Sequence, residues 1–136
     1  MENKKLIYMD NNATTRVYEE VLEAMLPYFK EKYFNPSSMY SVAGGVHKEM
    51  EKAREQVADF LGCEKVEVCF VSCGSEGDNM AIRGTIEAYP TKNNIITTKV
   101  EHHAVIETCK SLERLGYRIT LLDVDNDGNI NLEELK

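Results

Sequence analysis

VEVCFVSCGSEGDNMAIRG, residues 66–84, carries the clearest structural signal in this chain of 136 residues. Residues 66–71 are apolar and rich in β-prone side chains, which predicts a buried strand. The small residues 72–75 follow as a turn, and a helix is expected over about 76–88. A turn of small residues at a helix start leaves free backbone N–H groups beside the positive end of the helix dipole. The stretch therefore predicts a turn that can hold a phosphate.

The elements expected around this stretch alternate between strands and helices. The pattern predicts strands over 6–10, 66–71, 94–98 and 118–122, and helices over about 17–32, 45–61, 76–88 and 103–115. Asn35-Pro-Ser-Ser38 breaks the first helix from the second, Gly62 is placed to cap the second, and Gly116 is placed to stop the last. The βαβαβ order from residue 66 onward predicts an α/β fold, a mostly parallel sheet with helices on its faces. In such sheets, ligands bind at the carboxyl ends of the strands.

Composition limits the possible partners. With 43% hydrophobic and 29% charged residues, the chain is typical of one globular domain at most. A net charge of −7 without a basic block argues against nucleic acid or an anionic membrane as a partner. No apolar run is long enough for a membrane span and no signal peptide is present, so we expect a cytoplasmic protein. The four cysteines lack metal-ligand spacing, so buried free thiols and no metal are expected.

Two segments are candidates for chemistry. The turn Ser72 to Ser75 is neither a Walker loop nor a dinucleotide-binding motif. By itself it is therefore consistent either with a phosphate site or with a turn that has only a structural role. Cys73 lies in this turn, where a helix start tends to lower a thiol pKa, although it also serves as a small residue in a tight turn. His102 follows the strand 94–98, where its ring is suited to stacking on a flat ligand or moving protons. The two segments come from successive βα units and are expected to meet over one ligand.

The segment Asp123 to Glu134 offers a different function. It satisfies the calcium-loop pattern D-x-D-x-D-G-x5-E, with Glu134 as the closing ligand. The residues before it are β-prone and only two residues follow, so the flanking helix pair is missing. An Asp-Gly turn followed by a helix start at Asn131 accounts for the same residues without calcium. A small binding module with a calcium loop remains the alternative from another class.

Taken together, these segments resemble the NifS/IscS-type cysteine desulfurases, enzymes of the class V aminotransferase family and fold type I. Four blocks carry the resemblance in order: YMDNNATT at 8–15, NPSS at 35–38, FVSCGSEGDN at 70–79, and ITTKVEH at 96–102. The resemblance implies the N-terminal part of the large, aspartate aminotransferase-like domain of an enzyme that uses pyridoxal 5′-phosphate (PLP). Residues 1–136 would be that N-terminal segment and partial large domain, without the rest of the large domain and the C-terminal small domain.

The resemblance also implies roles for individual residues. Gly74 and Ser75 match the pair that holds the PLP phosphate, by backbone N–H and by hydroxyl. His102 matches the histidine that stacks on the pyridine ring and is thought to move protons. Ser75 stands where the family usually has Thr, and Cys73 replaces a Gly, which tests whether the turn needs a positive φ. No lysine or cysteine here matches the Schiff-base lysine or the persulfide-forming cysteine.

The implied activity is conversion of L-cysteine to L-alanine with formation of an enzyme persulfide. The sulfur would pass to a sulfur-acceptor scaffold protein for iron–sulfur cluster assembly, including that for nitrogen fixation, and the full-length enzyme is expected to be a homodimer. The chain alone is expected to be inactive, because the lysine and the nucleophilic cysteine are unmatched. A selenocysteine lyase or another class V aminotransferase relative is the alternative within the family.

Overall fold

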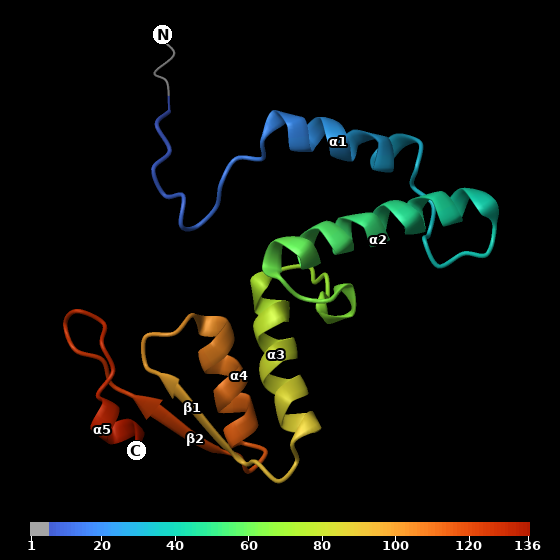
Figure 1. The fold of residues 1–136 in the computed structure, drawn as a ribbon. Helices are drawn as coiled ribbons and strands as arrows, with labels where there is room; N and C mark the ends of the chain where they lie inside the picture. Colours follow the sequence, from blue (N-terminus) through green and yellow to red (C-terminus); the bar gives the residue numbers. More distant parts are fainter. Residues whose placement is uncertain (1–5) are drawn as a thin grey trace. The chain divides into compact units, whose positions relative to one another are not determined.

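The computed structural model describes residues 6–136. The chain divides into two compact units, with the boundary between Val68 and Cys69. The first unit holds α1 (Glu19–Lys30), α2 (Ser41–Leu61) and the 3-10 turn η1 (Lys65–Glu67). The second holds α3 (Gly74–Ala88), β1 (Asn94–Thr98), α4 (His103–Glu113), β2 (Arg118–Leu122) and α5 (Leu132–Leu135). Figure 1 labels these elements, and each unit is described separately below.

Both predicted helices of the first unit are present. The first begins and ends within two residues of the predicted range, and α2 begins four residues earlier than predicted. Between them, the Ser37 N–H donates to Asn35 Oδ1 at 2.9 Å, so the NPSS segment turns as its proline and asparagine require. Gly62 ends α2 with φ of 70°, and its N–H donates to the Asp59 carbonyl. This left-handed cap confirms the predicted role of Gly62.

Two of the predicted strands are wrong. Residues 6–10 have no regular structure, and residues 66–71 form the end of η1 and an irregular segment. The turn is held by a capping box, in which the Glu64 N–H donates to the Glu67 carboxylate at 2.8 Å. A strand needs a partner for its N–H and C=O groups, and in the described residues β1 and β2 pair with each other alone.

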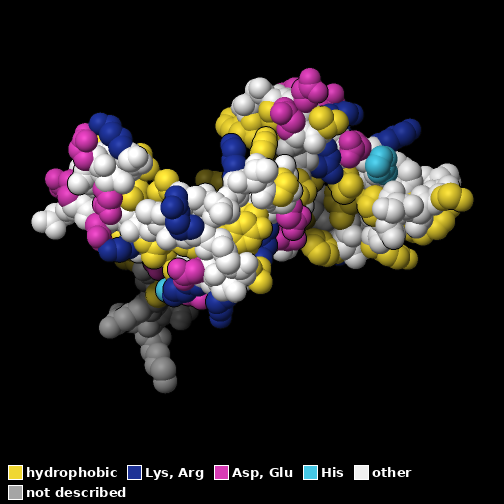
Figure 2. Space-filling view, turned by 90° about the horizontal axis from the view of Figure 1, so that it is seen from below, with side chains coloured by type: hydrophobic (Ala, Val, Ile, Leu, Met, Phe, Trp, Pro, Cys, Tyr) yellow, Lys and Arg dark blue, Asp and Glu magenta, His cyan; other side chains and the backbone are white. Residues whose placement is uncertain are grey.

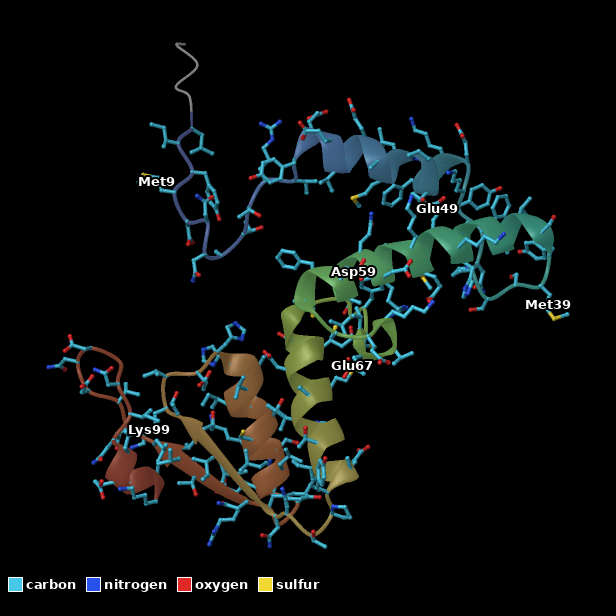
Figure 3. All side chains as sticks on the ribbon, in the orientation of Figure 1. Met9, Met39, Glu49, Asp59, Glu67 and Lys99 are labelled. Atoms are coloured by element: carbon cyan, nitrogen blue, oxygen red, sulfur yellow. The ribbon has the colours of Figure 1, made fainter. Side chains whose placement is uncertain are left out.

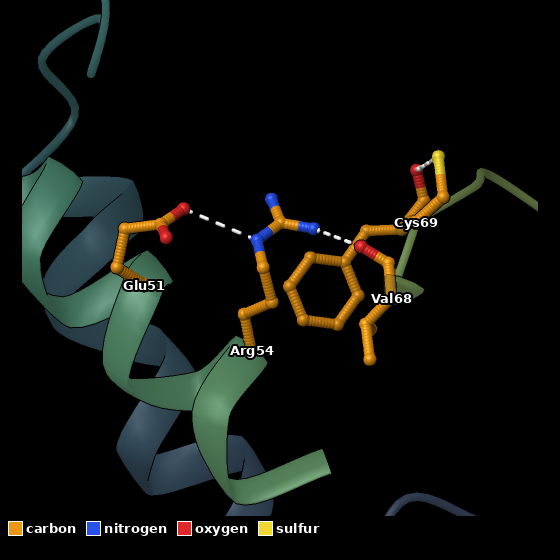
Figure 4. A network of polar contacts seen from close by, with 5 residues as sticks. Glu51, Arg54, Val68 and Cys69 are labelled. Atoms are coloured by element: carbon orange, nitrogen blue, oxygen red, sulfur yellow. Dashed lines mark hydrogen bonds and ion pairs between the residues drawn. The ribbon is translucent and has the colours of Figure 1, made fainter. Parts of the chain in front are cut away.

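Arg54 of α2 anchors the irregular segment within the first unit. Its guanidinium donates from Nη1 to the carbonyl of Val68 and from Nε to Glu51 Oε1 at 3.1 Å (Figure 4). One arginine fork therefore satisfies a backbone carbonyl that a sheet would otherwise have paired.

The second unit is a βαβ unit, β1-α4-β2, preceded by α3 and followed by the short helix α5. Strands β1 and β2 are parallel, with Asn94 opposite Arg118 and Thr98 opposite Leu122. Helices α3 and α4 contact each other, and α4 packs on β2 (Figure 1). The parallel pairing and the helices over the sheet agree with the predicted α/β fold. The predicted strands 94–98 and 118–122 are confirmed, as is the stop at Gly116, whose φ is 97°.

The buried core is small in both units. In the first unit the buried residues are Ala43 and Ala58 of α2, and in the second they are Ile86, Thr108, Cys109, Leu112 and Leu122. Large apolar side chains are exposed over both units, as the yellow areas of Figure 2 and the outward-pointing Met39 of Figure 3 show. All four cysteines are free, but Cys69 and Cys73 are exposed, so the prediction of buried thiols holds for Cys109 and not for these two. None of the helices among residues 6–136 is long and apolar enough to cross a membrane.

Candidate functional site

The first turn of α3 presents backbone N–H groups that no helical carbonyl accepts from. The first intrahelical hydrogen bond runs from the Gly77 N–H to the Cys73 carbonyl at 3.2 Å, so the N–H groups of Gly74, Ser75 and Glu76 precede the helical ladder. The N-cap residue Cys73 makes no capping hydrogen bond through its side chain. Its φ is −164°, an extended conformation, so this turn needs no glycine at position 73. These N–H groups, which no helical carbonyl accepts from, and the helix dipole together favour an anion here.

The space and the side chain beside these donors also suit a phosphate. A Cβ placed on Gly74 would meet nothing within 4 Å, so a ligand can approach the backbone closely at that residue. The hydroxyl of Ser75 has no hydrogen-bond partner among residues 6–136, which leaves it available to donate. The two residues assigned to phosphate binding therefore fit the phosphate group of PLP in chemistry and in access.

The side chain of Glu76 holds Ser72, the residue before the helix N-cap, in place. Its Oε2 accepts from the Ser72 N–H at 2.5 Å and from the Ser72 hydroxyl at 2.7 Å. These two bonds, the hydroxyl first, hold the pKa of Glu76 below its usual value and keep it ionised. This contact was not predicted from the sequence, because Ser72 precedes Glu76 by four residues and not by the three of a capping box.

Cys73 is an exposed thiol in an environment that favours the thiolate. Its pKa is lowered, first because the backbone N–H of Glu76 faces the sulfur and second because the Ser72 hydroxyl lies 3.8 Å from it. The direction agrees with the expectation for a thiol at a helix start. The sulfur and the phosphate donors thus share one helix end.

His102 caps the next helix. It is the N-cap of α4, and its Nδ1 accepts from the Ala104 N–H at 3.1 Å. Accepting at Nδ1 requires that nitrogen to be unprotonated, so the neutral ring carries its proton on Nε2. The ring is exposed and meets the neighbouring His103 edge-on, at 6.4 Å between centroids. A capped imidazole in this fixed orientation can present a face to a flat ligand and a proton at Nε2.

The fold brings these two segments to one end of the second unit. Helices α3 and α4 lie side by side and begin at the same end, where the carboxyl ends of β1 and β2 also lie (Figure 1). Lys99, labelled in Figure 3, ties those strand ends together through its ion pair with Asp123 at 2.7 Å. The segment before Ser72 forms no strand, so the arrangement rests on the helix starts and not on two strand ends.

The calcium-like segment satisfies its own polar groups. Asp125 Oδ1 accepts from the N–H groups of Asp127 and Asn129, both at 2.9 Å, and these contacts, Asn129 first, lower its pKa. Gly128 has φ of 86°, and the side chain of Asn131 caps α5. The Asp-Gly turn followed by a helix is therefore confirmed. In the described part of the chain, no three His, Cys, Asp or Glu side chains are grouped to hold a metal ion.

Comparison with known proteins gives consistent matches along the chain. Residues 7–136 match the family model described as aminotransferase class V. Cysteine desulfurase 2 of Trichormus variabilis is 55% identical over 131 residues, covering 96% of this chain and 33% of that protein. The cysteine desulfurase IscS of Clostridium botulinum is 48% identical over 133 residues, covering 97% of this chain and 34% of that protein.

Solved structures agree with the sequence matches. A NifS-like protein superposes with a TM-score of 0.89 at 44% identity, covering 95% of this chain and 36% of that one. The structure titled SspA in complex with cysteine superposes with a TM-score of 0.87 at 34% identity, covering 94% of this chain and 37% of that one. The resemblance found in the sequence is thereby confirmed, and the chain spans about a third of the length of the relatives it matches.

Proposed function

Because this chain belongs to the class V aminotransferase family, we propose that it forms the N-terminal segment and partial large domain of a PLP-dependent cysteine desulfurase. The observation that carries the proposal is the first turn of α3, whose N–H groups precede the helical ladder and whose Ser75 hydroxyl has no partner among residues 6–136, at the same end of the unit as His102. The names of the matched relatives and the neighbour solved with cysteine support the choice of reaction and of L-cysteine as substrate.

Each candidate residue has a defined task in this proposal. The N–H of Gly74 and the N–H and hydroxyl of Ser75 bind the phosphate, and Glu76 holds the Ser72 side of the turn in place. His102 orients a flat ring against its imidazole and holds a proton at Nε2 that it can pass on. PLP, when bound, supplies an electron sink for bond breaking at the α-carbon of an amino acid.

The wider activity belongs to the same proposal. The sulfur of L-cysteine would leave as an enzyme persulfide and pass to a sulfur-acceptor scaffold protein in the cytoplasm for iron–sulfur cluster assembly, with the full-length enzyme a homodimer. The 136 residues alone are expected to release no sulfide from L-cysteine and PLP. Sulfide release that is abolished by a substitution inside this chain would overturn that expectation.

The phosphate site is tested by removing one hydroxyl. Ser75→Ala is compared with Thr85→Ala, which removes a hydroxyl from the same helix, where it bonds the Ala81 carbonyl at 2.7 Å. Calorimetric titration with inorganic phosphate and with PLP should show affinities about tenfold lower for Ser75→Ala, as expected for one hydrogen bond to a charged group, and unchanged for Thr85→Ala. Equal affinities for Ser75→Ala and the unaltered chain would refute the assignment.

A further inference from the structure

Arg83 connects the two helices that carry the candidate site. Its Nη2 donates to the Ser111 hydroxyl of α4 at 3.0 Å. Its Nε donates to Asn79 Oδ1 at 3.3 Å, and Asn79 Nδ2 donates to the Ser75 carbonyl at 2.9 Å. A run of side-chain hydrogen bonds therefore extends from the phosphate-binding turn along α3 and across to α4.

The partners of Arg83 are neutral, which indicates a geometric role. The guanidinium is half-buried, and no ion pair among residues 6–136 includes it. Its planar fork can serve two acceptors at once in a fixed geometry, whereas a lysine ammonium would be a flexible point charge. The contact thus fixes where α3 and α4 meet along their lengths.

The two ends of this contact lie at similar numbers of residues from the starts of their helices. Arg83 lies ten residues after the N-cap Cys73, and Ser111 lies nine residues after the N-cap His102. The helices run in the same direction, and each residue adds about 1.5 Å along a helix. The contact therefore joins points at nearly equal depth, whereas a slip by one turn would displace one start by about 5.4 Å.

We propose that Arg83 is a positioning residue that sets the register of α3 against α4, so that one ligand can meet Ser75 and His102 together. The identity of that ligand rests on the proposed function, but the register does not. Inorganic phosphate needs the α3 turn alone, whereas PLP is large enough to use both helix starts. Loss of Arg83 should therefore weaken PLP binding selectively.

The test compares three variants of the chain. Arg83→Met removes both donors and keeps an apolar stem, and Ser111→Ala removes the acceptor on α4 while leaving Arg83 intact. Arg118→Met is the matched control, because it removes an arginine whose Nε donates to an asparagine, Asn94, at 3.0 Å between the strands. Amide NMR spectra report the register, and titrations with PLP and with inorganic phosphate report the site.

The expected result separates positioning from general loss of structure. Arg83→Met and Ser111→Ala should shift the amide signals of residues 74–77 and 103–106 and lower PLP affinity about tenfold, with phosphate affinity unchanged. Arg118→Met should do neither. Equal losses of PLP and phosphate affinity, or unshifted amide signals in Arg83→Met, would overturn the proposal. If the unaltered chain binds no PLP, the assignment of Gly74, Ser75 and His102 to PLP binding fails, and the amide signals alone decide the role of Arg83.

Discussion

Two adjacent leucines of β2 allow a sharp test of where the second unit is held together. Leu122 is 2% exposed and belongs to the core with Cys109 and Leu112 of α4, whereas Leu121 is 37% exposed. Successive side chains of a strand point to opposite faces, so the two residues report on opposite sides of the same strand. We predict that Leu122→Ala destabilises the protein much more than Leu121→Ala.

The size of each effect follows from burial. Truncating a buried leucine costs about 2–5 kcal/mol, and a small core that can relax around the gap favours the lower half, about 3 kcal/mol. Leu121 loses a smaller buried area and should cost about 1 kcal/mol. A unit of this size has a total unfolding free energy of about 3–10 kcal/mol, so the Leu122 variant loses a large part of it.

Urea denaturation followed by circular dichroism measures both variants against the unaltered chain. The same change is made at neighbouring positions of one strand, so the difference between the variants reports how each leucine packs on its own face. Equal losses of unfolding free energy, or a larger loss for Leu121→Ala, would show that α4 does not bury Leu122 against the sheet. The packing of α4, whose N-cap is His102, on β2 would then lack support.

Further outcomes follow from the caps and the charged groups. Gly62→Ala, at φ of 70°, should destabilise the protein by about 1 kcal/mol, whereas Gly44→Ala inside α2 should stabilise it by about 0.5–1 kcal/mol. A Cβ at either position meets no atom within 4 Å, so the two effects come from the backbone, and thermal unfolding that shifts in the same direction for both variants would contradict this prediction. Iodoacetamide should alkylate Cys73 at a lower pH than an ordinary thiol, because the pKa of Cys73 is lowered. Cys109 should resist alkylation, because it is buried and its pKa is raised, chiefly by desolvation. Peptide mass spectrometry that shows Cys109 reacting before Cys73 would refute this prediction. Because the pKa of Glu76 is lowered in the folded state, its contribution to stability is complete at neutral pH and is lost as pH falls through the folded-state pKa. Glu76→Gln should therefore flatten the acid part of a plot of unfolding free energy against pH. An unchanged slope in that acid part would argue against the Ser72 contact.

The sequence predicted the helices and the paired strands well because their signals are local. The apolar spacing of α1, α2 and α4 and the stops at Gly62 and Gly116 needed no knowledge of the rest of the fold. The strands expected over 6–10 and 66–71 failed for the opposite reason. Their apolar composition is suited to a sheet, but no partner strand lies beside them among the described residues.

The candidate site likewise divides into residues with a local sequence signal and a residue whose contact is long-range. Gly74, Ser75 and His102 were found from small residues at a helix start and a histidine after a strand, and they stay predictions until binding is measured. Arg83 was not found, because its contact with Ser111 spans 28 residues and depends on how two helices pack. A polar residue on a helix face gives no sign in the sequence of the helix it will meet.

The two-stranded sheet has a consequence for the behaviour of the protein in solution. Within the described residues β1 and β2 each pair on one side, so the other side of each strand carries unpaired backbone donors and acceptors. Such edges are templates for strand addition, and Ile96 of β1 and Leu121 of β2 add exposed apolar surface to them. We expect the chain to self-associate reversibly as its concentration rises, and a lysine at either exposed position should suppress that association by placing a charge at the open edge.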